Sequence, residues 1–314
     1  MAKGRFRIGL SMMGSYVEAS HTVDPLQWEP GIPDDEQAHV HGLDIGMMQW
    51  DLDAQFGLHE RFAIELQVPV RATVIAASFE YDQGNDLPDF SSIHHRDETI
   101  AGLGDVMLGG RIGVVRPEDV DRWTLALRVG LTLPTGKTEE NPFLLGAMGE
   151  EHQHMFFGNG TVDPTAGFDT NLAFDKWSLV GWTAARIPLY ANKHGYRGSR
   201  IVVGGIGARS GFGLEKWSFL LQPEVYYETP AQWANTAALN SGRTSLIATA
   251  GAFVMPKPGW LIHLQAKIPY KTWAQGGQLR WPFVAVAGFS YTFDVGKKKE
   301  KLPAGHSHED GHDH

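Results

Sequence analysis

Charged side chains recur at alternate positions in apolar segments, where they can line a water-filled passage. Arg128, for example, stands between Leu127 and Val129. Successive side chains of a β-strand point to opposite faces, so such a segment has one apolar and one polar face. Charges on the polar face can select solutes by sign and size, or can pair with one another and fill the passage. We expect the following residues to face a lumen: Arg71, Arg111, Arg128, Asp169, Arg186, Arg209, Glu224, His263 and Lys267.

Histidines form a second group of residues with potential chemistry. His39-Val40-His41 and His152-Gln153-His154 each place two imidazoles on one face of an extended chain. Imidazole is a ligand for Zn²⁺, Cu²⁺ and Ni²⁺. A His-rich tail can bind the same ions through neutral imidazoles and loses them below about pH 6. The alternative is that these are ordinary polar residues. The candidate metal ligands are His39, His41, His94, His95, His152, His154, His306, His308, His312 and His314.

Other chemistries are disfavoured by composition. The 314 residues include no cysteine, which excludes thiolate ligands and disulfides, and the net charge of −9 argues against general nucleic-acid binding. There is no Gly-x-Ser-x-Gly motif, and Ser92-Ile93-His94 is the one Ser–His pairing to consider. We therefore expect no enzyme activity and no cofactor other than weakly bound Zn, Cu or Ni.

The elements that would position these residues are strands that begin at aromatic corners. Five short polar corners each end in an aromatic residue, and an alternating segment follows each one. Aromatic residues repeated at one end of successive hairpins form a ring, and such rings lie at membrane–water boundaries. The interface aromatics expected from the corners and from the last strand are Phe62, Trp123, Trp177, Trp217, Trp260, Tyr291 and Phe293.

Twelve alternating segments predict an all-β fold, a transmembrane antiparallel up-and-down β-barrel. No apolar stretch reaches about 18 residues, which excludes a helical membrane protein. Short and long connections alternate, and both chain ends fall on the short-turn side, as in bacterial barrels. A soluble β-sandwich or propeller also alternates, but apolar faces long enough to cross a bilayer favour the barrel. The segments lie near 5–18, 38–56, 60–80, 104–116, 122–134, 164–174, 177–191, 199–213, 217–229, 243–255, 259–272 and 280–293.

Three details of this assignment are open to test. Met47-Met48 breaks the alternation of the second segment and suggests a β-bulge. Residues 81–103 read as a long polar connection. In the segment 259–272, Lys267 and Lys271 fall on the same polar face.

The last segment predicts how the barrel reaches its membrane. Residues 288–293 are a glycine followed by alternating aromatics, and this resembles the C-terminal β-signal that the outer-membrane assembly machinery reads. The expected location is therefore the bacterial outer membrane, with the lipid bilayer and that machinery as partners. The barrel spans 1–293, and 294–314 form a Lys- then His/Asp-rich tail that we expect to be disordered. The chain opens almost directly into a strand, so we expect the numbering to describe a mature or engineered form.

Three Gly- and Pro-containing segments form an ordered set. Gly102-Leu103-Gly104-Asp105 opens the fourth segment, Leu133-Pro134-Thr135-Gly136 closes the fifth, and Gly158-Asn159-Gly160-Thr161 with Asp163-Pro164 leads into the sixth. In that order, across residues 40–293, the chain resembles the outer-membrane barrels known as phenol meta-degradation-pathway transporters. The resemblance implies uptake of small, partly apolar aromatic compounds. We expect the glycines to allow tight loop conformations, and Asp105 and Asp163 to cap or pair at the barrel rim.

These observations support three functional hypotheses. The first is an outer-membrane channel that passes small solutes, including small aromatic or apolar compounds, without a nucleotide or redox cofactor. The second is a barrel with a filled lumen that captures or helps export transition metals through its His-rich loops and tail. The third is a structural or partner-docking barrel. Loops of about 20 residues are long enough to fold inward and close the pore, and the sequence does not decide whether they do.

Overall fold

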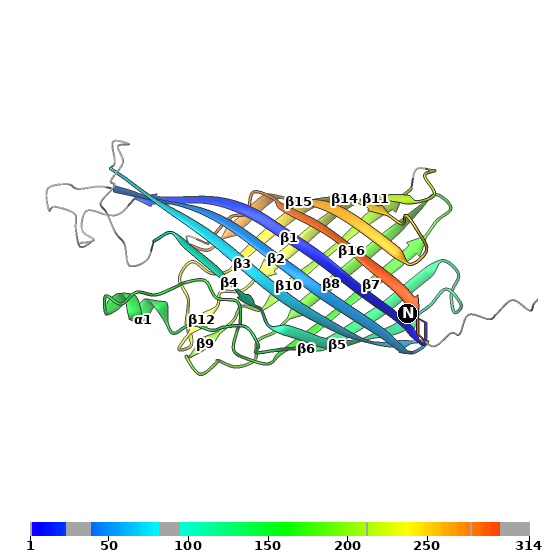
Figure 1. The fold of residues 1–314 in the computed structure, drawn as a ribbon, viewed down its shortest axis with the longest axis horizontal. Helices are drawn as coiled ribbons and strands as arrows, with labels where there is room; N and C mark the ends of the chain where they lie inside the picture. The colour runs from blue at the N-terminus through cyan, green and yellow to red at the C-terminus, as the bar shows by residue number, and fades with distance from the viewer. Residues whose placement is uncertain (1, 23–38, 82–94, 212, 277, 296–314) are drawn as a thin grey trace, which may run out of the picture.

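The structure is a closed antiparallel β-barrel. It is a computed structural model that describes residues 2–22, 39–81, 95–211, 213–276 and 278–295. The ring closes because β2 (His39–His59) pairs with both β1 (Arg5–Thr22) and β3 (Phe62–Tyr81), while β16 (Val284–Asp294) returns to pair with β1. Figure 1 shows the strands inclined around a common axis. The predicted twelve-stranded barrel is confirmed within the described residues.

The remaining elements follow in chain order. β4 and β5 both pair with β3 and act as one interrupted wall strand. The other wall elements are β4 (Glu98–Leu103), β5 (Val106–Val115), β6 (Trp123–Leu133), β7 (Asp163–Ala173), β8 (Trp177–Arg186), β10 (Ile201–Ser210), β11 (Trp217–Glu228), β14 (Arg243–Val254) and β15 (Trp260–Ala274). The loop elements are α1 (Pro142–Ala147), β9 (Tyr196–Arg197), β12 (Gln232–Trp233) and β13 (Thr236–Ala237).

The apolar face of the wall points outward. Along β11, Leu221 is 70% exposed, whereas Gln222 and Glu224 on the other face are 4% and 3% exposed. A soluble β-protein buries its apolar face, so this inverted arrangement fits strands whose outer face contacts lipid. Among the described helices, none has the length and apolar character needed to cross a membrane.

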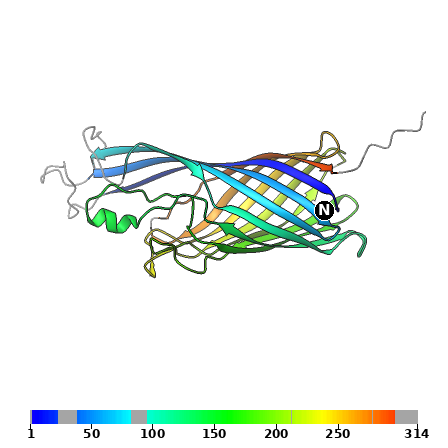
Figure 2. The same cartoon turned by 60° about the horizontal axis from the view of Figure 1, so that its bottom comes forward.

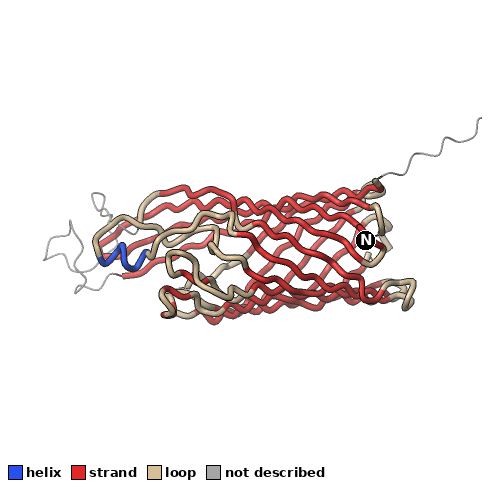
Figure 3. The backbone as a smooth tube through the Cα atoms, turned by 90° about the horizontal axis from the view of Figure 1, so that it is seen from below, coloured by secondary structure: helices blue, strands red, loops and turns tan. Residues whose placement is uncertain are grey.

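The connections divide the barrel into two ends. Short turns at 60–61, 116–122, 174–176, 213–216 and 255–259 make the short-turn end, and both terminal strands begin or finish there (Figure 1). The opposite, long-loop end carries α1, β9 and β12 (Figure 1), and β13 pairs with β12. Figure 3 shows the helix and the long loop segments at this end. β1, β2 and β3, with 18, 21 and 20 residues, extend beyond their neighbours at this end (Figure 2).

Two sequence-based expectations about strand continuity are wrong. Met47-Met48 is not a bulge, because β2 stays in unbroken register with β1 and β3 through both residues; the irregularity of the β2–β3 pair lies between Gly57 and His59. Residues 81–103 are not entirely loop, since β4 occupies the last six and pairs with β3. Their polar composition concealed this strand, because Glu98 and Thr99 lack the apolar alternation on which the assignment relied.

A β-bulge also corrects the expected orientation of Lys271. β14 pairs Leu246 with Lys271 and Ile247 with Pro269, so Tyr270 is an extra residue in β15. An extra residue reverses the alternation beyond it. Lys267 therefore remains inside, but Lys271 faces outward beside Trp273, with its ammonium 5.5 Å from the ring centre.

The predicted tail, 294–314, lies almost entirely outside the described residues, which end at Val295. Asp294 belongs to β16 and ion-pairs with Arg5 of β1 at 3.3 Å. The first and last strands are therefore joined by a salt bridge as well as by the backbone ladder.

Candidate functional site: the lumen and its inward loop

Three cavities succeed one another along the barrel axis. The short-turn cavity has a volume of about 840 Å³, the middle cavity about 560 Å³ and the long-loop cavity about 650 Å³. Arg7 lines both the short-turn and the middle cavity. The middle and long-loop cavities share Gln49, Arg71, Arg186, Ile201 and Val203. The cavities are therefore neighbouring compartments of one lumen, separated at the level of these shared side chains.

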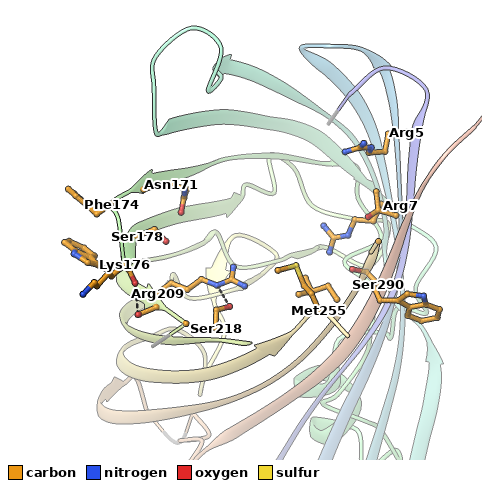
Figure 4. A pocket seen from close by; sticks show the side chains of 18 of the residues that line it. Arg5, Arg7, Asn171, Phe174, Lys176, Ser178, Arg209, Ser218, Met255 and Ser290 are labelled. Atoms are coloured by element: carbon orange, nitrogen blue, oxygen red, sulfur yellow. Dashed lines mark hydrogen bonds between the residues drawn. The ribbon is translucent and has the colours of Figure 1, made fainter. Parts of the chain in front are cut away.

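The short-turn cavity is bounded by two arginines. Figure 4 shows Arg7 of β1 and Arg209 of β10 extending into it from opposite walls. Nε of Arg209 donates to the hydroxyl of Ser218 at 2.8 Å, and its guanidinium lies 4.4 Å from the Phe253 ring centre. This mouth of the lumen is consequently positive.

Ion pairs run along the wall at the middle compartment and beside it. Arg128 of β6 contacts Glu65 of β3 at 3.0 Å, and Arg111 of β5 contacts Asp169 of β7 at 3.4 Å. In each pair a single wall strand separates the partners. These bridges therefore run along the wall, whereas the alternative of a lumen filled by ion pairs requires pairs that reach across it.

A second group of ion pairs lies toward the long-loop end. Glu224 accepts from Nζ of Lys267 at 2.7 Å and from the Thr249 hydroxyl at 2.7 Å. Arg243 pairs with Glu228 at 3.2 Å. Each buried carboxylate thus has a cation and further hydrogen-bonding neighbours, which offsets the cost of removing it from water.

A single carboxylate joins the three segments of the family resemblance. Asp105 accepts from the backbone N–H of Gly136 at 3.1 Å and of Asn159 at 2.8 Å. It reaches them because a bulge precedes β5: residues 104–106 face only 68–69 of β3. The Thr135 hydroxyl completes the junction by donating to the Gly104 carbonyl at 2.8 Å.

The segment that leads from Asn159 into β7 is also held by a carboxylate. Asp163 accepts from the Asn159 side chain at 2.7 Å and from the Thr161 hydroxyl at 2.6 Å, and both Asp163 and Thr161 are fully buried. Asn192 of the next loop donates to the Asn159 carbonyl at 3.0 Å. We call Asp105, Gly136, Asn159, Thr161 and Asp163 the loop anchor.

The loop anchor holds residues 154–159 inside the barrel. His154, Met155, Phe156, Phe157 and Asn159 all line the long-loop cavity. The Phe157 carbonyl accepts from Nη1 of Arg71 at 3.4 Å, at the boundary with the middle cavity. The question that the sequence left open is thereby answered: the long loop folds inward and narrows the lumen.

An aromatic cluster covers the inward loop. Phe156 meets Tyr196 edge-on, with ring centres 4.8 Å apart, and Trp233 lies 4.8 Å from Tyr196. Burial raises the pKa of Tyr196 to about 12. These three rings come from three different loops, so sequence patterning alone carried no signal that they meet.

The candidate metal ligands fall into two described groups. His41 lies between His39 and His95, with ring centres 4.7 and 5.1 Å away. His152 and His154 approach each other with 3.1 Å between their Nε2 atoms. Within the described ranges no three His, Asp or Glu side chains form a group able to hold a metal ion. His94, His306, His308, His312 and His314 lie outside the described residues.

The expected lumen and interface residues occupy opposite faces of the wall. The charged set lines the cavities or the ion-pair networks just described, and His263 lies on the inner face of β15 with its ring 5.8 Å from Phe253. Each of the seven interface aromatics is between 36% and 45% exposed. Trp177 stacks on Phe174 at 4.2 Å, and Trp260 lies 5.0 Å from Tyr291.

Comparison with known proteins finds likeness in structure alone. No protein-family model matches the sequence, and no curated protein matches it. The structure is similar to an outer membrane channel from Pseudomonas putida F1, with a TM-score of 0.58 and 13% identity over 93% of this chain and 97% of that one. This likeness shows that the fold is that of a bacterial outer-membrane barrel.

Two further solved structures have lower similarity. The translocator domain of the autotransporter NalP from Neisseria meningitidis has a TM-score of 0.44 and 11% identity, covering 93% of this chain and 90% of that one. The P. putida toluene transporter TodX has a TM-score of 0.41 and 9% identity, with the same coverage of 93% and 90%.

Proposed function

We propose that the protein is an outer-membrane channel through which small, partly aromatic solutes pass passively. The observation that carries this proposal is the series of three cavities along the barrel axis, in which each neighbouring pair shares lining residues. Two facts support it: the ion pairs run along the wall instead of across the lumen, and the similar structure from P. putida F1 is an outer membrane channel. No catalytic step, nucleotide or redox cofactor belongs to this role.

The lining of the long-loop cavity supports an aromatic or partly apolar solute. Its volume of about 650 Å³ falls in the range of roughly 300–1,000 Å³ found for small-molecule sites. Phe157, Trp182, Tyr226 and Met155 contribute rings and a thioether, while polar side chains are interspersed among them. Apolar walls with a few placed polar groups are typical of sites for small organic molecules.

The inward loop sets a size limit for the passage. Because residues 154–159 occupy part of the lumen and contact Arg71, a solute must pass between this loop and the wall. A single phenyl-sized ring fits such a passage better than an oligosaccharide does. The proposal therefore predicts transport of small compounds that carry one aromatic ring, with little transport of larger sugars.

The test combines planar-bilayer conductance with liposome swelling. The purified, refolded protein is expected to give steady current, and liposomes containing it are expected to admit phenyl β-glucoside faster than a trisaccharide. Protein-free liposomes give the background rate. The absence of current together with swelling rates equal to the background would overturn the proposal.

A further inference from the structure

Two arginines at the boundary between the middle and long-loop cavities have no carboxylate partner among the residues that the structure describes. Arg71 projects from β3 and Arg186 from β8, and both line both cavities. β5, β6 and β7 separate these strands in the wall, so the guanidiniums reach the boundary from different sides. Within the described ranges, no carboxylate oxygen lies within 4.0 Å of either guanidinium.

Two carboxylates of the same compartment, Asp51 and Asp105, accept hydrogen bonds from neutral donors. Asp51 accepts twice from the Gln49 amide, at 2.9 Å each, and Asp105 accepts from the backbone N–H groups of the loop anchor. Neither is therefore required as a counter-ion of the arginines. This contrasts with Arg111, Arg128, Arg243 and Lys267, each of which has a carboxylate within 3.4 Å.

Both guanidiniums retain donors that can bind a ligand. Arg71 uses Nε for Gln49 at 2.8 Å and Nη1 for the Phe157 carbonyl, out of five N–H groups. Nε of Arg186 is buried and donates to no acceptor in the described part of the chain. A cation withdrawn from bulk water without a partner is costly, and a bound anion offsets that cost.

We propose that Arg71 and Arg186 form a binding site for the carboxylate of a small aromatic acid. Arginine presents its N–H groups in a planar fork that matches the two oxygens of a carboxylate. The aromatic ring of the solute would lie in the long-loop cavity, where Phe157, Trp182 and Tyr226 supply apolar and aromatic surface. This inference rests on the proposed channel function and names its substrate class.

Calorimetric titration of the intact, detergent-solubilised protein tests the site. Sodium benzoate is the probe, benzamide is its neutral isostere, and acetate lacks the ring. We expect one benzoate per barrel and at least tenfold weaker binding of both benzamide and acetate. Equal affinity for benzoate and benzamide would overturn the role of the arginines, and equal affinity for benzoate and acetate would overturn the role of the ring.

Substitutions locate the site. R71Q and R186Q are each expected to weaken benzoate binding at least tenfold. R209Q is the matched control. Arg209 also faces the lumen and has no carboxylate partner in the described part of the chain, but it lies in the short-turn cavity. An equal loss in R209Q would show a general field effect and refute the specific site. Should a variant fail to fold, the comparison of benzoate, benzamide and acetate on the unaltered protein still decides the question.

Electrical measurements separate this inference from the channel proposal. With potassium benzoate on one side and potassium chloride on the other, the reversal potential measures benzoate permeation at a pH where the acid is ionised. Steady current and phenyl glucoside flux without benzoate binding would leave the channel standing and remove the arginine site. Loss of all current and flux would remove the channel itself.

Discussion

Gly136 and Gly158 lie backbone against backbone, and a methyl group on Gly136 would stand 2.7 Å from the Cα of Gly158. The contact joins the end of β6 to the segment that leads into β7, and it brings the inward loop against the wall. Side chains are excluded here by the approach of two backbones, which gives the glycines of both segments a physical role.

The first prediction concerns this approach. We expect Gly158→Ala to displace residues 154–159 and to raise single-channel conductance, because its methyl group would overlap the Gly136 backbone. The melting temperature should change little, since the wall ladder is untouched. Gly46→Ala is the control, because nothing lies within 4 Å of its added Cβ. Equal conductance of both variants and the unaltered protein would contradict the prediction.

The second prediction concerns Asp105. Asp105→Asn replaces an acceptor oxygen by a donor, so one of the two backbone N–H groups loses its partner. Hydrogen bonds to charged groups contribute about 1.5–3 kcal/mol each, and the loop anchor should loosen by an amount of that order. Limited proteolysis within 134–162 is expected to accelerate. Asp121→Asn, at a carboxylate whose side chain is 91% exposed, removes the same charge and should have no effect.

The third prediction concerns the contact between His152 and His154. Nδ1 of His152 lies 2.8 Å from the Glu150 carbonyl, and its Nε2 lies 3.1 Å from Nε2 of His154. Because His154 begins the inward loop, loss of this contact should loosen residues 154–159 and raise single-channel conductance.

Joint replacement of His152 and His154 by Gln tests this contact, with single-channel conductance as the measurement. His59→Gln, at the short-turn end, is the control and should conduct as the unaltered protein does. Equal conductance of the double variant and the unaltered protein would contradict the prediction.

The fourth prediction follows from the buried phenol of Tyr196. Its pKa of about 12 exceeds the unfolded value of about 10 because burial disfavours the phenolate. The unfolded chain therefore loses this proton first, and the free energy of unfolding should decrease as the pH rises through that interval. The difference in tyrosinate absorbance between the unaltered protein and Tyr196→Phe measures the pKa. Ionisation of Tyr196 near pH 10 would show that the ring is accessible to water.

The wall could be predicted from the sequence because its signal is local. The alternation after Trp217 places Leu221 outward and Glu224 inward, as the structure has them. A β-bulge cannot be predicted in this way. One inserted residue reverses the face to which the following side chains point, without changing the composition of the segment. Tyr270 shows the consequence, since it alone turns Lys271 to the outer face.

The site was predictable only in part, for a related reason. Strand phase placed Arg71 and Arg186 on the inner face, but it could not show which cations lack a carboxylate. That depends on side chains from non-adjacent strands, such as Glu65 reaching Arg128 across β5. The Gly and Asp motifs predicted tight loop conformations at the rim. That two of the three motifs donate hydrogen bonds to Asp105, in the third, could not be predicted, because it depends on the bulge before β5.

The unequal lengths of the wall strands make the long-loop end of the barrel asymmetric. The eleven residues of β6 extend about 36 Å at about 3.3 Å per residue, which suffices for a tilted strand to cross an apolar band of about 25 Å. β2 has ten residues more than β6. Together with β1 and β3 it extends beyond the apolar band, so the wall is longer on that side of the barrel (Figure 2). On the inner face of this longer part of the wall, Val17 and Ile45 are buried, with exposed fractions of 3% and 1%. A molecule that approaches the long-loop end therefore meets a wall whose strands extend further along β1, β2 and β3 than along the opposite side.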